Sequence, residues 1–503
     1  MRNSYHKVVV SSNELSLNSY DSVIVPTTLK QLKSKDFKSV AGSLGRRHSG
    51  FLERFTATRN IKPSKSTMFS CDLDSNLHAV VAIFDPEATM FEYLSTARSI
   101  LKNLEPIEPR KILLDLRNVE NYDAKIIDSI VSAFVVSQFQ HPKYGKDASK
   151  AKKKKAKIFI ATKKQATEDC INDAEAAEAS AIQTNLVRTL ATLPTNELTC
   201  KSYVEKAIDL SKQLNLKTSF ISQQKLSQME AGAFLSVARG SNHKDAGILK
   251  IEYKCSNPNA KNIALVGKGI VFDTGGINVK PGTYMFGMHG DMGGSAVTLA
   301  TTLLAATEQW PVHITCYLAI AENAVSNHAF LPNEVVTASN GMAIEVVHTD
   351  AEGRMVLADT LSIASEEKYD LILDFATLTG SAVQAIGTTY SAGFTNNDEL
   401  HSMITSAGKN SGERIWSFPL DKDFGESLKS DVADIKQCRL RGGVDHIEAA
   451  YFLSQFVKKG IDWIHIDLAS CENSGGLGHV PTEVTGFGVR FARELIDCYR
   501  ARS

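Results

Sequence analysis

The chain is 503 residues long, which predicts two domains, one of them large. Hydrophobic residues make up 43% of it and charged residues 22%, a balance typical of a soluble globular protein, and its formal net charge is zero. This composition excludes a general electrostatic attraction to nucleic acid or to an anionic membrane. The chain contains no run of about 18 apolar residues, so no membrane span is predicted.

The N-terminal segment, MRNSYHKVVVSSNELSL, lacks the apolar stretch of a signal peptide and is not of the transit-peptide type. The eight cysteines are scattered and form no CxxC pair, so they are interpreted as buried reduced thiols. These observations predict a cytoplasmic protein.

Residues 1–165 alternate short β-branched runs with stretches of helical spacing, which predicts an N-terminal α/β domain. Strands are expected at residues 7–10, 22–26, 78–84, 111–116 and 156–162, and helices at 88–104 and 123–140. Between the last helix and strand, eight lysines lie from Lys143 to Lys157. We interpret this basic segment as a solvated loop or hairpin tip, with nucleic-acid binding as the alternative.

Residues 166–190 predict a helix that links two domains, with Thr167 as its cap. Residues 191–503 again alternate strands and helices. This pattern predicts a larger catalytic α/β/α domain with a central mixed, mostly parallel sheet covered by helices.

The segment from residue 262 to 282 joins a predicted buried strand to charged residues and glycines. Lys268 follows five apolar residues, Asp273 ends the run, and a glycine pair precedes Lys280. Glycines after a strand let the backbone turn sharply or approach a ligand. The pattern fits a ligand site or an internal ion pair between Lys268 and Asp273, and it lacks the spacing of a P-loop.

Two further segments place acids at the starts of predicted helices. Asp291 precedes two glycines and a small-residue helix, where it also suits the positive end of the helix dipole. In HTDAEGRMVLADTL, Asp350, Glu352 and Arg354 are spaced two apart. An extended backbone would point all three the same way, whereas a helix start would use the acids as a cap and first-turn charge but leave the arginine unexplained.

The segments together bring four carboxylates and two lysines to strand ends and loops of one α/β domain. Ligand sites in such sheets form outside the carboxyl ends of the strands. Four crowded carboxylates repel one another unless cations neutralise them, and two divalent metal ions would do so. Oxygen-rich ligation fits Mn²⁺ or Zn²⁺, with Co²⁺ and Mg²⁺ as further alternatives.

Several segments resemble the signature segments of the leucyl (cytosol) aminopeptidase family. They are VGKGIVFDTGG, NVKPG, DMGGSA, HTDAEGRMVLADTL and ATLTG, in the family's order and spacing, with further agreement in LPTNELT, MEAGAFLSVARGS and WIHIDLA. The resemblance covers residues 180–495 and implies a metal-dependent aminopeptidase that hydrolyses single N-terminal residues, of the leucine type and others, from peptides.

The resemblance implies that five residues hold two divalent metal ions in each subunit. These residues are Lys268, Asp273, Asp291, Asp350 and Glu352. Asp273 and Glu352 would bridge the two ions, Lys268 and Asp291 would complete one site, and Asp350 the other. Lys268 would ligate as the neutral amine, because the metals and burial lower its pKa.

The resemblance also implies the two catalytic residues, Lys280 and Arg354. In the mechanism that the resemblance implies, a water activated by the two metals would attack the peptide carbonyl, and Lys280 would stabilise the oxyanion. Arg354 would hold a bicarbonate ion that relays the proton as general base. The free α-amine of the substrate would bind a metal, which would explain the removal of single N-terminal residues.

The family's pocket for the first side chain maps onto four residues, which would make it apolar and roomy. They are Met288, Thr377, Gly380 and Ala469. If Glu472 also lines this pocket, basic N-terminal residues would be accepted; otherwise it points to solvent. His348 stands where the family has asparagine, and the sequence leaves the effect of that change open.

The family forms hexamers, so the resemblance implies a homohexamer that acts on peptides. The zero net charge disfavours a nucleic-acid partner, and the lack of a long apolar run predicts no membrane partner. Two alternatives come from other classes. A DNA-binding accessory role is supported only by the lysine-rich segment, and an inactive structural relative is disfavoured because all five ligand positions are retained.

Overall fold

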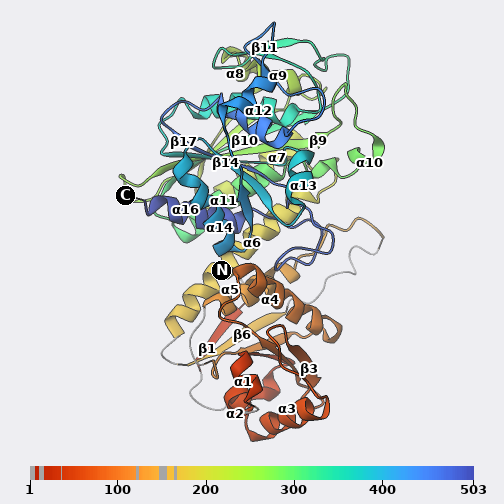
Figure 1. Cartoon of the computed structure of the whole chain (residues 1–503), viewed down its shortest axis with the longest axis vertical. Coiled ribbons are helices and arrows are strands. Elements are labelled where there is room, and N and C mark those ends of the chain that lie inside the picture. Colours follow the sequence, from red (N-terminus) through yellow and green to blue (C-terminus); the bar gives the residue numbers. More distant parts are fainter. Residues whose placement is uncertain are drawn as a thin grey trace. The chain divides into compact units, whose positions relative to one another are not determined.

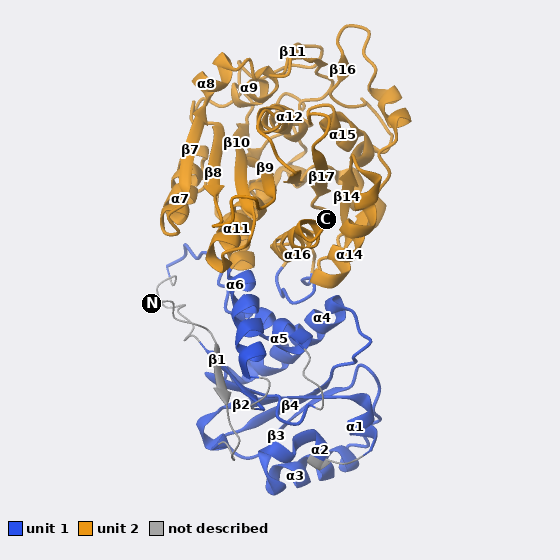
Figure 2. Ribbon diagram, turned by 90° about the vertical axis from the view of Figure 1, so that its left-hand side faces the viewer, with its two compact units in different colours: residues 1–182, 475–482 blue, residues 183–474, 483–503 orange. Residues whose placement is uncertain are grey.

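The structure is a computed structural model that describes residues 6–10, 16–34, 37–119, 124–146, 156–163 and 167–502 (Figure 1). The chain forms two compact units (Figure 2). Unit 1 contains residues 1–182 and 475–482, and unit 2 contains residues 183–474 and 483–503. The long helix α6 (Thr167–Ala191) contains the point at which the chain leaves unit 1. The assignment of residues 191–503 as a catalytic domain stays a prediction.

Unit 1 is built on one six-stranded sheet. Its strands are β1 (His6–Val10), β2 (Ser22–Thr27), β3 (Met68–Asp72), β4 (His78–Ile83), β5 (Lys111–Asp115) and β6 (Lys157–Thr162). They lie in the order β1-β6-β5-β2-β4-β3, and only the edge strand β3 is antiparallel to its neighbour. The five predicted strands are confirmed, and β3 was missed because its short sequence, MFSCD, mixes apolar with polar residues and gives no apolar run.

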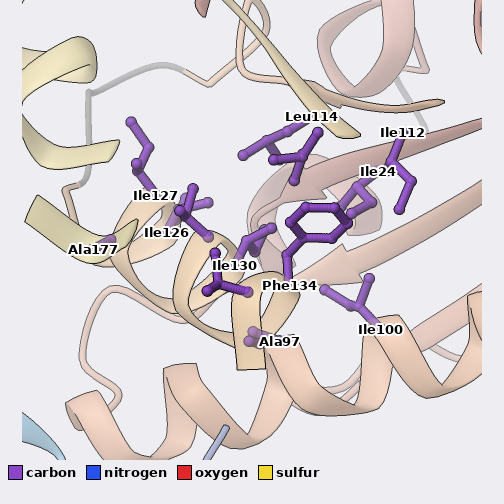
Figure 3. Packing of buried hydrophobic residues seen from close by; sticks show 14 of the residues in the cluster. Ile24, Ala97, Ile100, Ile112, Leu114, Ile126, Ile127, Ile130, Phe134 and Ala177 are labelled. Carbon is purple, nitrogen blue, oxygen red and sulfur yellow. The ribbon is translucent and has the colours of Figure 1, made fainter. Parts of the chain in front are cut away.

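Helices cover both faces of this sheet. They are α1 (Leu29–Lys33), α2 (Phe37–Ala41), α3 (Arg46–Thr58), α4 (Met90–Leu104), α5 (Ala124–Ser137) and the first part of α6. Alternate residues of β2 point to opposite faces of the sheet. Ile24 packs in the core under α4 and α5, whereas Val23 and Val25 pack in the core under α1 to α3. Figure 3 shows Phe134 of α5 pointing towards Ile24 and Ile112 on the strands.

The segment of residues 475–482 belongs to unit 1 although the chain around it belongs to unit 2. Val480 is part of the core under α4 and α5. Arg98 of α4 donates hydrogen bonds from Nη1 to the carbonyl oxygens of Gly475 (3.2 Å) and Val480 (3.0 Å). A short piece of chain from far along the sequence therefore completes the packing of unit 1.

Unit 2 is built on an eight-stranded mixed sheet. The strands are β7 (Lys217–Ser222), β8 (Gly247–Tyr253), β9 (Asn262–Asp273), β10 (His313–Asn323), β13 (Leu371–Ala376), β14 (Ser391–Thr395), β15 (Ile415–Ser417) and β17 (Asp462–Asp467). Their order is β15-β14-β17-β13-β9-β10-β8-β7, and the four central strands are parallel. A small second sheet contains β11 (Val335–Thr337), β12 (Ala343–Glu345) and β16 (Ile435–Lys436).

Helices lie on both faces of the large sheet (Figures 1 and 2). They are α7 (Cys200–Lys212), α8 (Gln223–Gln228), α9 (Gly232–Ala238), α10 (Gly282–Met285), α11 (Gly293–Glu308), α12 (Glu352–Ala364), α13 (Gly380–Ile386), α14 (His401–Ser411), α15 (Asp445–Ser454) and α16 (Val489–Arg500), with remaining residues of α6. The helix α11 packs on β9, β10 and β13 beside α16, and α12 packs on the opposite face beside α9 and α15. The predicted mixed α/β fold is confirmed.

Two composition-based expectations concern the whole chain. In the described ranges, no helix has both the length and the apolar character needed to cross a membrane. All eight cysteines are free thiols, and five of them are buried as predicted, whereas Cys255, Cys471 and Cys498 are partly exposed. Of the lysine-rich segment, residues 147–155, including Lys152 to Lys155, lie outside the described residues.

Candidate metal centre and active site

The acids predicted from three separate segments meet at the carboxyl edge of the central strands. Asp273 is the last residue of β9, Asp350 lies just before α12, and Glu352 is the first residue of α12. Carboxylate oxygens from these three side chains all lie within 4.8 Å of one another. Asp291, two residues before α11, joins them through Lys268. This edge is where ligand sites form in parallel sheets.

Lys268 of β9 lies among these acids. Its Nζ is 2.8 Å from both carboxylate oxygens of Asp291 and 3.0 Å from Oε1 of Glu352, and it donates a hydrogen bond to the carbonyl of Thr377 (2.8 Å). Burial opposes the charged amine, but the surrounding carboxylates outweigh it and raise the pKa of Lys268. Within the described residues, the suggested ion pair of Lys268 with Asp273 is not formed.

Asp273 is paired with Lys280 instead. The Nζ of Lys280 lies 2.9 Å from Oδ2 of Asp273 and 2.6 Å from Oδ1 of Asp350. Burial lowers the pKa of Lys280, but the two carboxylates outweigh burial and hold it above its ordinary value. The side chain is 16% exposed, so this cation lies at the accessible side of the cluster.

The cluster carries more negative than positive charge, because four carboxylates face two lysines. Burial raises the pKa values of Asp291, Asp350 and Glu352, and the neighbouring carboxylate of Asp273 raises them further. Glu352 is only 1% exposed, and its Oε2 has no hydrogen-bond partner in the described part of the chain. Such an oxygen is costly to bury unless a cation or donor reaches it.

A second layer of hydrogen bonds fixes the acids. Oδ1 of Asp273 accepts bonds from the Gly275 backbone N–H and from Nδ2 of Asn323, both at 2.8 Å. Asn323 also donates to the carbonyl of Thr349 (3.1 Å), and Thr349 donates from Oγ1 to the carbonyl of Gly275 (2.6 Å). Asn323 was not predicted from the sequence, although it ends β10 beside the end of β9, a position that could have indicated it.

Two glycines are required by close approach at the site. Gly275 has a φ of +85°, and an added Cβ would lie 2.5 Å from the carbonyl oxygen of Asn278. A Cβ at Gly353 would lie 2.6 Å from Cε of Lys268. The glycine of TDAEGR therefore lets the first turn of α12 pass directly beside the lysine stem.

The segment HTDAEGR is neither extended throughout nor capped by its acids. The helix α12 begins at Glu352, and its N-cap, Ala351, provides no side-chain cap. The Asp350 N–H instead donates to Nδ1 of His348 (3.3 Å). An asparagine side chain closes a turn in the same way, by accepting a hydrogen bond from the backbone N–H two residues later. His348 can therefore take the place of asparagine here.

Arg354 contacts Gln437 and Asp445 through its guanidinium. It is 2% exposed; Nη1 donates to the carbonyl of Gln437 (3.1 Å), and Nη2 lies 2.8 and 3.0 Å from the two carboxylate oxygens of Asp445. Among the described residues, Nε has no hydrogen-bond partner. Neither Gln437 nor Asp445 was singled out from the sequence.

The predicted pocket residues lie in four different elements. Thr377, after β13, donates from Oγ1 to Oδ1 of Asp291 (2.7 Å). Met288 is partly buried in a short 3₁₀ helix, Gly380 begins α13 with open space where a Cβ would lie, and Ala469 is buried after β17. Thr377 is thus the one of these residues with a direct contact to a predicted metal ligand in the described structure.

Glu472 lies in a separate narrow cleft of about 20 Å³ that Gly290 and Gly293 also line. Its Oε1 is 3.6 Å from the position of a Cβ on Gly290. Burial, followed by the nearby Glu483, raises the pKa of Glu472. Whether this carboxylate selects basic substrates stays a prediction.

Comparison with known proteins decides the family. Residues 185–492 match the catalytic domain of the cytosol aminopeptidase family. The chain belongs to this family. A probable cytosol aminopeptidase of Rickettsia bellii is 33% identical over 410 residues, 79% of this chain and 80% of that protein. One from Rickettsia massiliae is 37% identical over 315 residues, 62% of this chain and 63% of that protein.

Solved structures show the same fold over nearly the whole chain. The bottromycin maturation enzyme BotP in complex with Mn has a TM-score of 0.81 and 27% identity, covering 95% of this chain and 99% of that one. A tomato leucine aminopeptidase variant has a TM-score of 0.84 and 23% identity, covering 99% and 97%. The family member described here is a metal-dependent aminopeptidase, a hydrolase that acts on peptides.

Proposed function

We propose that this aminopeptidase removes single N-terminal residues from peptides with two divalent metal ions in each subunit. The observation that carries the proposal is the surplus of buried carboxylate at the edge of β9, with the unpartnered Oε2 of Glu352. The donor set, mainly carboxylate oxygens with one amine, fits Mn²⁺ or Zn²⁺ and also suits Co²⁺ or Mg²⁺. Bound divalent cations would compensate the surplus negative charge and give the unpartnered oxygen of Glu352 a cation to bind.

The ligand roles are those that the family resemblance implies, and the contacts are compatible with them. Asp273 and Glu352 would bridge the two ions and Asp350 would hold one of them, and oxygens of these three side chains lie within 4.8 Å of one another. Lys268 and Asp291, already in contact, would complete the other site. Lys268 serves as a ligand only after losing its proton, which the incoming positive charge favours.

The chemistry divides between the ions and the chain. When bound, the two ions would act as Lewis acids that activate a water molecule and polarise the scissile carbonyl. Lys280 would hold its positive charge towards the oxyanion that forms, since Asp273 and Asp350 keep it protonated and oriented. Thr377 would keep Lys268 and Asp291 in place through its carbonyl and hydroxyl groups.

The bicarbonate ion implied at Arg354 stays a prediction of the resemblance. The residues around Arg354 do not fit it well, because Nη2 already meets a carboxylate and Nη1 a carbonyl. The Nε is buried. We therefore assign no step to bicarbonate.

The substrate pocket, assembly and compartment belong to the same proposal. An apolar first residue such as leucine would lie against the residues Met288, Thr377, Gly380 and Ala469. Comparing the hydrolysis of leucine and arginine amides by the wild type and Glu472→Ala tests whether the acid adds selectivity for basic residues; unchanged selectivity removes that idea. A homohexamer in the cytoplasm is expected, and light scattering after size exclusion measures the assembly.

Metal restoration tests the proposed function most directly. Metal-stripped protein is assayed on a panel of aminoacyl reporters after addition of Mn²⁺, Zn²⁺, Co²⁺ or Mg²⁺. We expect no turnover without metal and recovery with at least one ion. Lys280→Ala should slow turnover while retaining metal, and a variant that loses its metal instead would place Lys280 among the structural contacts of the centre.

A further inference from the structure

Asp445 provides a permanent carboxylate for Arg354. Its two oxygens lie 2.8 and 3.0 Å from Nη2 of the arginine, and the arginine is almost fully buried. The Asp445 side chain itself is 39% exposed. Solvent could therefore satisfy this acid, and its position against Arg354 reflects attraction between the charges rather than a lack of space elsewhere.

The loop before Asp445 is built to hold it there. Gly442 and Gly443 have φ values of +67° and +91°, and Asp445 then begins α15. Behind this turn, Arg439 pairs with Glu448 (2.6 Å). The ion pair ties the start of the loop to the first turn of α15, so the loop presents Asp445 in one position.

Gln437 fixes the same segment to the loop that carries the predicted metal ligands. Its Oε1 accepts bonds from the N–H groups of Val347 (3.1 Å) and His348 (3.2 Å), and its Nε2 donates to the carbonyl of Ala351 (2.9 Å). Its own carbonyl accepts from Arg354. Gln437 therefore joins the HTDAEGR segment to the segment that leads to Asp445, next to the guanidinium of Arg354.

A carboxylate and a bicarbonate ion present the same chemistry to arginine, two oxygens in a plane that match the guanidinium fork. Both oxygens of Asp445 lie against Nη2, and the backbone carbonyl of Gln437 accepts a hydrogen bond from Nη1. A second anion on this edge would meet the negative charge of Asp445 at close range. Groups of the chain itself thus occupy Nη1 and Nη2, and Nε is the guanidinium nitrogen without a hydrogen-bond partner among the described residues.

We propose that Asp445 is a positioning residue that replaces exogenous bicarbonate at Arg354, so that this aminopeptidase works without added bicarbonate. The inference rests on the proposed catalytic role of Arg354. Removing the side chain should empty the guanidinium edge and create a binding site for a small carboxylate-type anion.

The test compares wild type, Asp445→Gly and Asp445→Asn as metal-loaded proteins in buffer freed of carbon dioxide. Wild-type turnover should not change when bicarbonate is added. Asp445→Gly should lose turnover by about tenfold, the effect of one charge-assisted hydrogen bond, and bicarbonate or formate should restore it. Asp445→Asn, which fills the space without the charge, should lose turnover and respond less.

A calorimetric titration of bicarbonate into each protein gives a readout independent of activity. We expect no binding heat with wild type and saturable binding with Asp445→Gly. The matched control is Asp423→Asn, which removes an exposed acid in the short helix of residues 422–428 and should behave as wild type. The contact of His446 with Ser381 (2.7 Å) remains in every variant, so α15 should stay folded, as melting temperatures will show.

Wild-type turnover that rises with bicarbonate, together with bicarbonate binding to wild type, overturns the proposal. Equal bicarbonate responses of wild type and Asp445→Gly overturn it as well. If no metal gives wild-type aminopeptidase turnover, the proposed function fails instead, and the calorimetric comparison still decides whether Asp445 fills the anion site.

Discussion

Each unit buries an aspartate at the carboxyl end of a central parallel strand, yet the two surroundings differ. In unit 1, Asp115 ends β5 and is 2% exposed. One oxygen accepts from Nε of Arg117 (2.9 Å), and the other accepts from its Nη2 (2.9 Å) and from Oγ of Ser43 (2.6 Å). In unit 2, Asp273 ends β9 among three further acids and only two lysines.

The charge balance around these two aspartates shows which feature indicates a metal site. A buried acid at a strand end is compatible with a purely structural role when one arginine and local donors satisfy it, as with Asp115. At Asp273 the charge is not balanced by the side chains present, and Glu352 keeps a buried oxygen without a partner among the described residues. Surplus charge, more than position, separates a metal centre from a structural ion pair.

The largest expected effect comes from removing an acid of the surplus set. Glu352→Ala should lower turnover by at least about 1,000-fold, because a bridging ligand and the activation it supports are lost together. Turnover on leucine amide and metal content by elemental analysis measure this. Asp115→Ala is the control and should keep the metal and the rate per folded molecule. A Glu352→Ala protein with both metals and a near-normal rate would refute the two-metal assignment.

The reverse experiment concerns stability. Asp115→Ala leaves the guanidinium of Arg117 poorly paired in a buried site, so the free energy of unfolding should fall by about 4 kcal/mol. Urea unfolding followed by fluorescence and circular dichroism measures the change. Ser43→Ala, which removes one neutral donor to the same carboxylate, should cost less. Equal losses for the two variants would show that the charge pair contributes little.

A third buried acid extends the comparison to pH. Burial raises the pKa of Glu413 to about 7, although backbone N–H groups of Phe491 and Gly488 at the start of α16 donate to it. The folded protein then binds a proton more tightly than the unfolded chain does. Stability should therefore fall as pH rises from about 4.5 to about 7, by about 3 kcal/mol at most.

Glu413→Gln should remove that part of the slope, because the amide oxygen can accept the same bonds without taking a charge. Unfolding curves of wild type and variant at pH 5 and pH 8 give the comparison. At pH 8, the free energy of unfolding of the variant should rise relative to that of the wild type. An identical difference between the two proteins at both pH values would mean that Glu413 has an ordinary pKa in the folded state.

The smallest expected effect is local. Chelation of the metal should leave the carboxylates of unit 2 unneutralised and speed backbone hydrogen exchange around Gly275 and the start of α12 by about tenfold. Exchange in β5 beside Asp115 should not change. Mass spectrometry of peptides from the two strand ends measures both. Equal acceleration in the two units would indicate general loosening rather than loss of a bound ion.

The sequence was sufficient for the central strands and for the acids of the site. Both are local properties: apolar runs such as β9 identify the strands, and the acids stand directly after strands or before helices. The helices α1 and α2 were missed, since five residues each are too few to show a period.

Pairing within the site could not be predicted, because it depends on tertiary packing. Lys268 contacts Asp291 and Glu352 rather than Asp273, since α12 passes beside its stem. The acid that pairs with Arg354 lies 91 residues away, at the first residue of α15 and directly after an irregular loop. Asn323 could have been predicted from its position at the end of a strand, but it was overlooked because its side chain is uncharged.

The return of residues 475–482 to unit 1 bears on how the chain can be divided. A fragment that stops at residue 182 would lose Val480 from its core and both carbonyl acceptors of Arg98. Residues 1–182 therefore do not form a complete domain that can be separated from the rest of the chain or exchanged alone. A version of unit 1 made alone would need residues 475–482 as well as residues 1–182.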